Sequence, residues 1–202
     1  TSLINPRQIV SVYGLSDPPG APSDWTNSTL AQDKIIAPPL QEGDSVFVAT
    51  GDSQLFALDA TTGEALWDLP FEAENPIWGP MAYADGHVYV ASMDGNIYAL
   101  NADSGTQDGV WQTGSSFPGG LTLAGDTIFA GGLDNNLHAF DRNSPGTAET
   151  WIFTAETGIW GAPVVVDGQV FFGDMNGNVY AANAATGTSS WKVAGVGPTV
   201  TS

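Results

Sequence analysis

The stretch Met93-Asp94-Gly95-Asn96-Ile97-Tyr98-Ala99-Leu100-Asn101-Ala102-Asp103-Ser104-Gly105, which is followed by Trp111, recurs in related form three more times along this chain of 202 residues. The other copies are residues 51–63 before Trp67, residues 133–146 before Trp151 and residues 175–187 before Trp191. These tryptophans stand 44, 40 and 40 residues apart. A period close to forty residues predicts a repeat architecture in which each copy is one supersecondary unit.

Each copy carries the signals of short antiparallel strands. An alternating run that ends in Asp or Asn leads into a tight turn, where glycine supplies a positive φ. A second alternating run lies upstream, and the Gly/Asp pair before it is a strong hairpin signal. A further short run precedes that pair. The upstream runs are Val46–Ala49, Val88–Ala91, Ile128–Gly131 and Val170–Gly173, and the further runs include Pro80–Tyr83 and Pro163–Val166.

Four short strands joined as a meander make one blade of a propeller. No segment shows sustained 3.6-residue periodicity with capping residues, so the sequence predicts no helix. The predicted fold class is therefore all-β, a β-propeller of four-stranded antiparallel blades. We expect four full blades and partial blades at both termini.

A family resemblance rests on the same residues. The motif Tyr98-Ala99-Leu100-Asn101-Ala102-x-x-Gly105 and its counterpart Leu58-Asp59-Ala60-Thr61-Thr62-Gly63 resemble the repeats of pyrroloquinoline-quinone (PQQ)-type β-propellers. The resemblance covers about residues 35–194 and implies that the repeat tryptophans pack between neighbouring blades. Similar blades serve quinoprotein dehydrogenases, outer-membrane-assembly lipoproteins and sensor domains, so the function stays open. The residues expected between blades are Trp25, Trp67, Trp111, Trp151 and Trp191.

The repeat divides the chain into segments. Trp25 stands 42 residues before Trp67, and we interpret it as the last tryptophan of an incomplete blade; an ordered N-terminal arm is the alternative. The predicted segments are an arm and partial blade (1–34), four blades (35–74, 75–113, 114–157 and 158–194) and the start of a further blade (195–202).

A propeller closes on itself because closure removes its edge strands. The two termini could combine into one composite blade that lacks a strand. Alternatively, the chain is a segment of a larger ring or closes with a second copy of itself. We favour a larger ring or closure with a second copy, because PQQ-type propellers resemble rings with more than five blades. This alternative predicts continuation beyond residue 202 or a homo-oligomer formed through residues 1–30 and 195–202.

The composition of the chain excludes some classes of binding partner. The formal net charge is −18, from 22 acidic and 4 basic residues, which argues against nucleic acid and anionic membrane as partners. No apolar run is long enough for a transmembrane helix, and a lipid anchor stays open as an alternative. There is no cysteine, which excludes disulfides and thiolate sites.

The sequence offers little for catalysis. His138 takes the strand position that holds Phe56, Tyr98 and Tyr180 in the other copies, and we interpret it as a packed histidine. His87 lies at a strand start, where we expect it to be exposed. Quinoproteins of the family resemblance hold their cofactor with Ca²⁺, a stacking Trp and adjacent cysteines, and basic groups would have to offset its carboxylates. We therefore predict no catalytic, cofactor-binding or metal-binding residue.

One face of the predicted propeller carries the candidate binding residues. The turns between the second and third strands of each blade and the loops between blades should lie on the same face. Trp78 and Trp160 are additional to the repeat tryptophans and occupy equivalent loops. They could plug the central channel, or they could form an aromatic platform rimmed by carboxylates. The platform would consist of Trp78, Phe117, Trp160, Asp52, Asp94, Asp134 and Asp174.

These observations favour a non-enzymatic, PQQ-like propeller that acts as an extracytoplasmic scaffold, periplasmic or at the cell surface, with a protein partner. Two alternatives remain open. The chain could be a quinone- or ligand-binding module, with the mouth of the channel as its pocket. It could also be a structural subunit that assembles through open blade edges.

Overall fold

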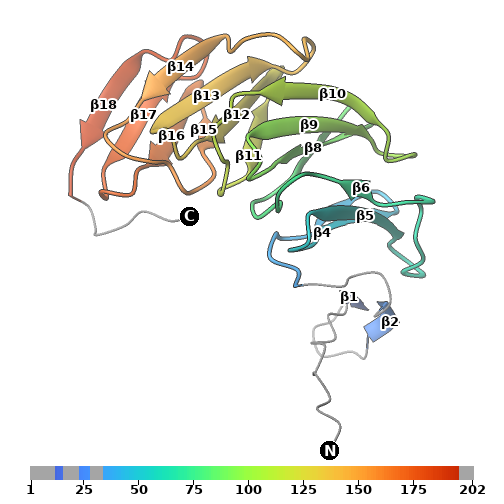
Figure 1. Ribbon diagram of the computed structural model, residues 1–202. Helices are drawn as coiled ribbons and strands as arrows, with labels where there is room; N and C mark the ends of the chain where they lie inside the picture. The colour runs from blue at the N-terminus through green and yellow to red at the C-terminus, as the bar shows by residue number, and fades with distance from the viewer. Residues whose placement is uncertain (1–11, 16–22, 28–33, 196–202) are drawn as a thin grey trace, which may run out of the picture.

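A computed structural model describes residues 12–15, 23–27 and 34–195, and these residues form strands and turns without a helix. Four antiparallel sheets of four strands each follow one another along the chain. Figure 1 shows the four sheets as successive blades of one arc. The prediction of an all-β propeller with four-stranded meander blades is thereby confirmed.

Each blade consists of four strands that follow one another in the sequence. The first blade consists of β3 (Leu40–Glu42), β4 (Ser45–Ala49), β5 (Gln54–Asp59) and β6 (Phe71–Glu72). The second consists of β7 (Ala82–Ala84), β8 (His87–Ala91), β9 (Asn96–Asn101) and β10 (Gln107–Gln112). The third consists of β11 (Leu121–Ala124), β12 (Thr127–Gly131), β13 (Asn136–Asp141) and β14 (Trp151–Thr154). The fourth consists of β15 (Val164–Val166), β16 (Gln169–Gly173), β17 (Val179–Asn183) and β18 (Ser189–Val193).

The first two strands of a blade are joined by the tight turns that the Gly/Asp pairs predict. In the second blade, Asp85 and Gly86 connect β7 to β8 with φ values of 48° and 77°. Positive φ at both central residues is the geometry of a type I′ turn, whose twist matches that of the flanking strands. Asp167 and Gly168 repeat this arrangement between β15 and β16, with φ values of 49° and 75°.

The hydrophobic core lies between the blades. Three clusters of buried side chains each combine residues of two neighbouring blades, because both faces of an inner blade are apolar. Phe47 and Leu55 of the first blade, for example, share a cluster with Val88 and Leu100 of the second. The first strands of the blades are innermost, and β11 contacts both β7 and β15. Burial between blades therefore sets their stacking order around the arc.

The repeat tryptophans couple each blade to the next. The indole N–H of Trp67 donates to the carbonyl of Ala102 at 2.9 Å, in the turn after β9. Trp151 donates in the same way to Ala184 at 3.1 Å, in the turn after β17. The ring of Trp67 lies against Gly105, where a Cβ would approach the ring to 2.7 Å. The tryptophan that follows each turn thus serves contact between blades, as the family resemblance implied.

Trp111 is buried as predicted, but it has a different partner in the sheet from Trp151. Trp111 pairs with Ile97, whereas Trp151 pairs with the Ala139 that corresponds to Ala99 of the second blade. The register of β10 against β9 also shifts near its start, between Gln107 and Gly109. Trp111 is nevertheless fully buried and donates to the carbonyl of Ser144 at 3.2 Å.

Trp191 is 42% exposed, so the prediction that it is buried between blades is wrong for this structure. It lies on β18 of the fourth blade, and no later blade is present in the described residues to offer a turn carbonyl. Its ring contacts Phe171 of its own blade, with 6.0 Å between the ring centroids. Burial of a repeat tryptophan therefore depends on the blade that follows it.

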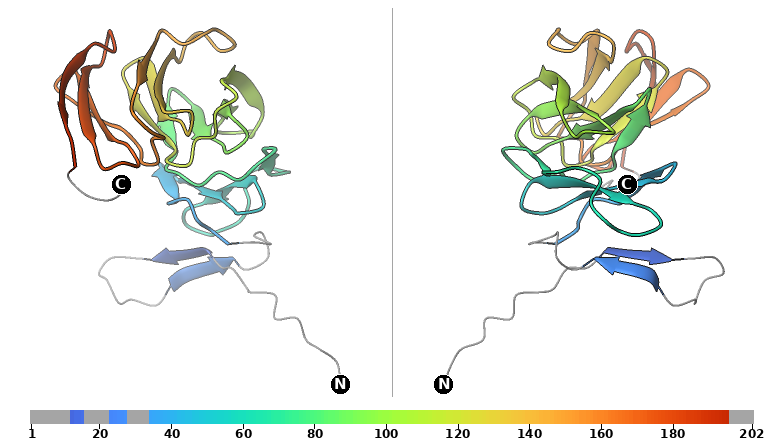
Figure 2. Two further views of the ribbon diagram at one scale, coloured as in Figure 1. Left: turned by 60° about the vertical axis from the view of Figure 1, so that its left-hand side comes forward. Right: turned by 90° about the vertical axis from the view of Figure 1, so that its right-hand side faces the viewer.

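The N-terminal region contributes a two-stranded sheet. β1 (Val12–Leu15) pairs with β2 (Ser23–Asn27), and Gly14 lies opposite Trp25 in the register. Figure 2 shows this hairpin beyond the first blade. The assignment of this hairpin to a partial blade remains a prediction. The packing of the Trp25 side chain and the predicted strand at residues 196–200 lie outside the described residues and remain predictions.

Replacing Trp111 with Ala should lower the free energy of unfolding by roughly 3–5 kcal/mol, because it removes a fully buried indole between two blades. Urea denaturation of purified protein measures this loss. Trp191→Ala is the matched control and should cost about 1 kcal/mol or less, since that side chain is half exposed. Equal losses in the two variants would contradict the coupling of blades by buried tryptophans.

Candidate functional site

The loops between blades and the turns between second and third strands lie on one face, as predicted. Each such turn donates a backbone hydrogen bond to the loop that precedes its blade. Met93 donates to the Pro76 carbonyl at 3.0 Å, and Met175 donates to the Gly158 carbonyl at 2.9 Å. The first blade repeats this bond between Gly51 and Lys34 at 2.7 Å. We call this surface the loop face.

The loop face contains a hollow of about 420 Å³ at the centre of the arc. Trp78 and Trp160 lie on its wall with their ring centroids 6.4 Å apart and their planes tilted by 34°. Trp160 is 37% exposed, and Trp78 is half-buried. The structure thus brings together the two additional tryptophans that the sequence singled out, although they stand 82 residues apart in the sequence.

The wall of the hollow follows the internal repeat. The same loop position is occupied by Ile36, Trp78, Pro118 and Trp160 before the first, second, third and fourth blades, respectively, and all of them line the hollow. In the second, third and fourth blades, the residue before this position points into the protein instead. Ile77, Phe117 and Ile159 are at most 1% exposed, whereas Ile35 of the first loop is only partly buried. Each of these three loops is therefore anchored by one buried side chain and presents the next one to the hollow.

This alignment corrects one predicted platform residue. Phe117 was expected beside Trp78 and Trp160, but it is fully buried and belongs to the core between the second and third blades. Its ring meets His138 edge-on, with 5.6 Å between the centroids. Pro118, rather than Phe117, is the counterpart of the two tryptophans. The sequence signal that could have shown this is the Gly119 that follows Pro118, as Gly79 follows Trp78.

Glycines set the close approach of the loops. A Cβ added to Gly79 would lie 2.0 Å from the backbone nitrogen of Gly120. A Cβ added to Gly119 would lie 2.2 Å from the carbonyl oxygen of Trp160. Since real Cβ contacts are never this short, the loops can pack backbone against backbone only because these positions lack side chains. This packing fixes Trp78 and Trp160 relative to each other.

The predicted rim of carboxylates is not part of the hollow. None of Asp52, Asp94, Asp134 and Asp174 belongs to its lining. Their oxygens accept hydrogen bonds from nearby turns and side chains, and Asp94 also accepts from the backbone of Glu74, at the end of the first blade, at 3.1 Å. Asp94 accepts hydrogen bonds from the backbone of Asn96 at 2.9 Å and from the Tyr98 hydroxyl at 2.8 Å. Burial, together with this bond to a carboxylate, raises the pKa of Tyr98 to about 12. These aspartates hold the turns in place.

Asp174 shows the structural role most clearly, because it is completely buried. It accepts hydrogen bonds from the backbone of Asn176 and Asn178, from the Asn178 amide and from the Tyr180 hydroxyl, at 2.8–3.0 Å. Burial alone would raise the pKa of this carboxyl, but the hydrogen bonds from Asn178, Tyr180 and Asn176 outweigh it and hold the pKa below the ordinary value of 3.8. Asp174 is therefore unable to contact a partner in this structure.

The third blade replaces the tyrosine of this arrangement with a histidine. His138 is 2% exposed, which confirms the prediction of a packed histidine. Its Nε2 lies 3.2 Å from Asp134, and its Nδ1 lies 3.0 Å from Glu149. Burial raises the pKa of Asp134, but hydrogen bonds from Asn136 and the proximity of His138 more than reverse this effect, so the net shift is downward. The sequence reasoning missed Glu149, because nothing in the repeat marks it as a neighbour of His138.

His87 differs from the expectation of an exposed, inert residue. It is half-buried at the start of β8, and its Nε2 lies 3.0 Å from Asp108 of β10. Its ring also lies 6.3 Å from that of Tyr89, measured between centroids. His87 therefore links two strands of its own blade at a distance from the hollow.

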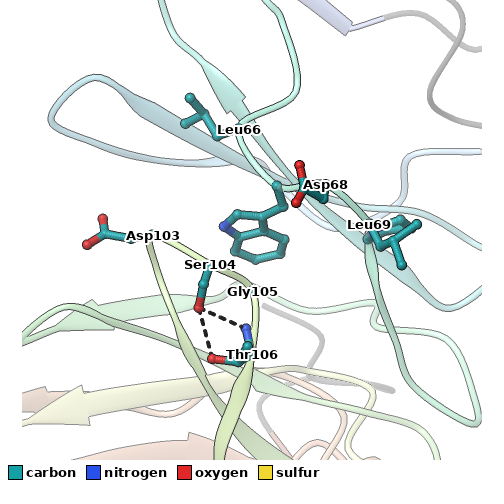
Figure 3. A pocket seen from close by; sticks show the side chains of 9 residues that line it. Leu66, Asp68, Leu69, Asp103, Ser104, Gly105 and Thr106 are labelled. Atoms are coloured by element: carbon teal, nitrogen blue, oxygen red, sulfur yellow. Dashed lines mark hydrogen bonds between the residues drawn. The ribbon is translucent and has the colours of Figure 1, made fainter.

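A second hollow, of about 490 Å³, lies between the first and second blades (Figure 3). Its wall combines the turn at Asp103–Thr106 with Leu66 and Leu69, which are 44% and 78% exposed. β6 has only two residues. The segment from Trp67 to Pro70 therefore lies outside the sheet, which the chain joins only at Phe71. The dashed lines in Figure 3 mark the bonds of Ser104 to Thr106 that stiffen the turn.

The residues of the central hollow do not fit PQQ. Its lining carries no charged side chain, whereas this cofactor presents three carboxylates that need basic partners. Within residues 12–15, 23–27 and 34–195, no group of three or more His, Asp or Glu side chains could hold a metal ion. In the same residues, no helix is long and apolar enough to cross a membrane.

Replacing Asp174 with Asn should lower the free energy of unfolding at neutral pH by roughly 1–3 kcal/mol, because an amide cannot accept all the hydrogen bonds that converge on this buried carboxylate. A lowered pKa stabilises the folded state above the ordinary value of 3.8 and ceases to do so as the pH falls through the folded-state value. The difference from the unsubstituted protein should therefore shrink below about pH 4.

Thermal or urea unfolding at a series of pH values measures both effects. Asp52→Asn is the matched control, because Asp52 occupies the same kind of turn but is exposed. It should change stability by less than about 0.5 kcal/mol. A loss in Asp174→Asn that is no larger than this control would contradict the structural role of Asp174.

Comparison with known proteins agrees with this geometry. The family model described as "Outer membrane protein assembly factor BamB" matches residues 17–116 and 108–202. A relative with that name from Burkholderia pseudomallei (strain K96243) is 31% identical over 178 residues, which cover 80% of this chain and 45% of the relative. A probable quinate dehydrogenase (quinone) from Xanthomonas campestris pv. juglandis is 39% identical over 62 residues, which cover 30% of this chain and 8% of that protein. The chain thus spans less than half the length of these relatives.

Solved structures show the same architecture. BamB from Moraxella catarrhalis superposes with a TM-score of 0.66 at 22% identity, over 91% of this chain and 70% of that one. The computationally designed Ika4 protein superposes with a TM-score of 0.65 at 16% identity, over 77% of this chain and 94% of that one. At these identities the likeness shows the fold alone. The family match, which extends over most of the chain, shows that this protein belongs to the BamB family of PQQ-like β-propellers.

Proposed function

We propose that this chain is a non-enzymatic scaffold that binds a protein partner through its loop face. The observation that carries the proposal is the central hollow, where Ile36, Trp78, Pro118 and Trp160 occupy one repeated position and line a common wall. Exposed aromatic side chains on a rigid support are typical of binding surfaces. The loops are fixed by glycine packing and by buried anchors, so the surface is preorganised.

The setting that we propose is extracytoplasmic. Relatives of this family are named outer membrane protein assembly factors, and we propose that this chain serves in the same kind of assembly at the cell envelope. Its net charge of −18 favours a partner with a basic surface and disfavours nucleic acid.

Quinone binding is the second candidate, because the short match to a quinate dehydrogenase falls within a quinone-dependent enzyme. The uncharged lining of the hollow speaks against it, since PQQ carries three carboxylates. Incubation with PQQ and Ca²⁺, followed by gel filtration, separates the two functions. Co-elution of the visible absorbance with the protein would favour the quinone module over the scaffold.

Assembly through blade edges is the remaining alternative, and the fourth blade offers one observation in its favour. Val164, Val166, Trp191 and Val193 are 42–56% exposed, and the register places them on one face of the sheet. In the other blades, the corresponding face is covered by the next blade. We propose that a second copy of the chain covers it. Light scattering after size exclusion should then show a dimer or larger species, and Trp191→Asp should shift it to monomer.

Changing both Trp78 and Trp160 to Ser should abolish capture of the protein partner with little change in melting temperature, because neither indole belongs to the clusters between blades. The measurement is affinity capture from a cell-envelope fraction, with the bound proteins identified by mass spectrometry. Ile152→Ser, which changes an exposed apolar side chain outside the hollow, should capture the same partner as the unsubstituted protein. Unchanged capture by the double variant would refute the loop face as the binding surface.

A further inference from the structure

The two tryptophans of the hollow differ from the repeat tryptophans in their hydrogen bonds. Trp67, Trp111 and Trp151 each donate their indole N–H to a backbone carbonyl of the following blade. Among the hydrogen bonds of residues 12–15, 23–27 and 34–195, none comes from the indole nitrogen of Trp78 or Trp160. Since indole N–H groups find an acceptor when they become buried, a ligand that covers these rings has to supply one.

The rest of the lining of the hollow is apolar, although the chain as a whole is strongly acidic. Pro38, Pro80 and Pro118 join the two tryptophans and Ile36, and no charged side chain lines the space. Apolar sites lined by aromatic rings recognise polyproline II segments, whose backbone carbonyls are unpaired and whose shape is fixed before binding. A helix cannot match this site equally well, because its own backbone already occupies its carbonyl groups.

The charge of the chain indicates what flanks such a segment. The protein has 22 acidic and 4 basic residues, so its field attracts cations, while the hollow itself is uncharged. Exposed carboxylates such as Asp52 and Asp134 lie in turns of the same face. Basic residues are therefore favourable beside the segment, and apolar or proline residues within it.

We infer that the central hollow binds an extended, proline-containing segment of a partner protein, flanked by basic residues, with carbonyl groups of the segment accepting from the indoles of Trp78 and Trp160. This inference rests on the proposed function and specifies the partner of the same site. The prolines of the segment pack against Trp78, Pro118 and Trp160. The energetic advantage is that a preformed polyproline II segment loses little conformational entropy when it binds.

The test uses a synthetic peptide with a Pro-x-x-Pro core and arginines on both sides, titrated into the purified chain by calorimetry. Trp78→Phe and Trp160→Phe keep an aromatic ring but remove the N–H donor, and each should weaken peptide binding roughly two- to tenfold, as expected for one lost hydrogen bond. Trp151→Phe is the matched control, because it removes an indole donor that lies outside the hollow, and it should bind the peptide as tightly as the unsubstituted protein. A peptide with Ala in place of both prolines should bind more weakly.

Equal binding of the proline and alanine peptides, or no effect of either Phe substitution, would overturn the inference. So would tight binding of a matched peptide with glutamates in place of the arginines. The capture experiment distinguishes failure of this inference from failure of the proposed function. If the Trp78→Ser/Trp160→Ser variant loses the envelope partner but the peptide does not bind, the scaffold function stands and the inferred proline segment is wrong.

Discussion

The structure depends on one repeated interaction, the hydrogen bond from the indole of a repeat tryptophan to a turn carbonyl of the next blade. Trp67, Trp111 and Trp151 all make this bond, at 2.9–3.2 Å. Each bond joins segments that the chain places more than thirty residues apart, and the buried ring adds apolar area to the same interface. Like other repeat proteins, the chain gains much of its stability from contacts between neighbours. The orientation of one blade against the next follows from this contact.

That orientation brings the loops between blades to one central point. Their glycines allow backbone contact, and Ile77, Phe117 and Ile159 anchor them in the core. The remaining side chain of each loop then faces the hollow, where Trp78 and Trp160 meet. The chain thus uses tryptophan in two ways. Trp67, Trp111 and Trp151 donate their indole N–H between blades, whereas among the described residues no acceptor lies in reach of the indoles of Trp78 and Trp160. This difference in hydrogen bonding separates the structural from the binding tryptophans.

Much of this fold could be predicted from the sequence, because the turn-to-tryptophan motif recurs at a nearly constant period. Its irregularities had structural meaning that the pattern alone does not reveal. Trp111 pairs with Ile97 rather than with Ala99, the counterpart of the Ala139 that pairs with Trp151, and the exposure of Trp191 depends on a neighbour rather than on its own repeat. At the site, Trp78 and Trp160 were identified, but Phe117 was aligned one position off. The burial of Asp174 could not be foreseen, since it results from Asn178 and Tyr180 converging on one carboxylate.

The most direct test of this account is hydrogen exchange at the tryptophan indoles, followed by nuclear magnetic resonance with each signal assigned by a Trp→Phe variant. The account predicts slow exchange for Trp67, Trp111 and Trp151, whose N–H groups are bonded between blades, and fast exchange for Trp78 and Trp160. On addition of a binding partner, the signals of Trp78 and Trp160 should move and become protected, while the other three stay unchanged. Fast exchange at the three repeat positions, or a partner that protects no signal of the hollow, would contradict the division between structural and binding tryptophans.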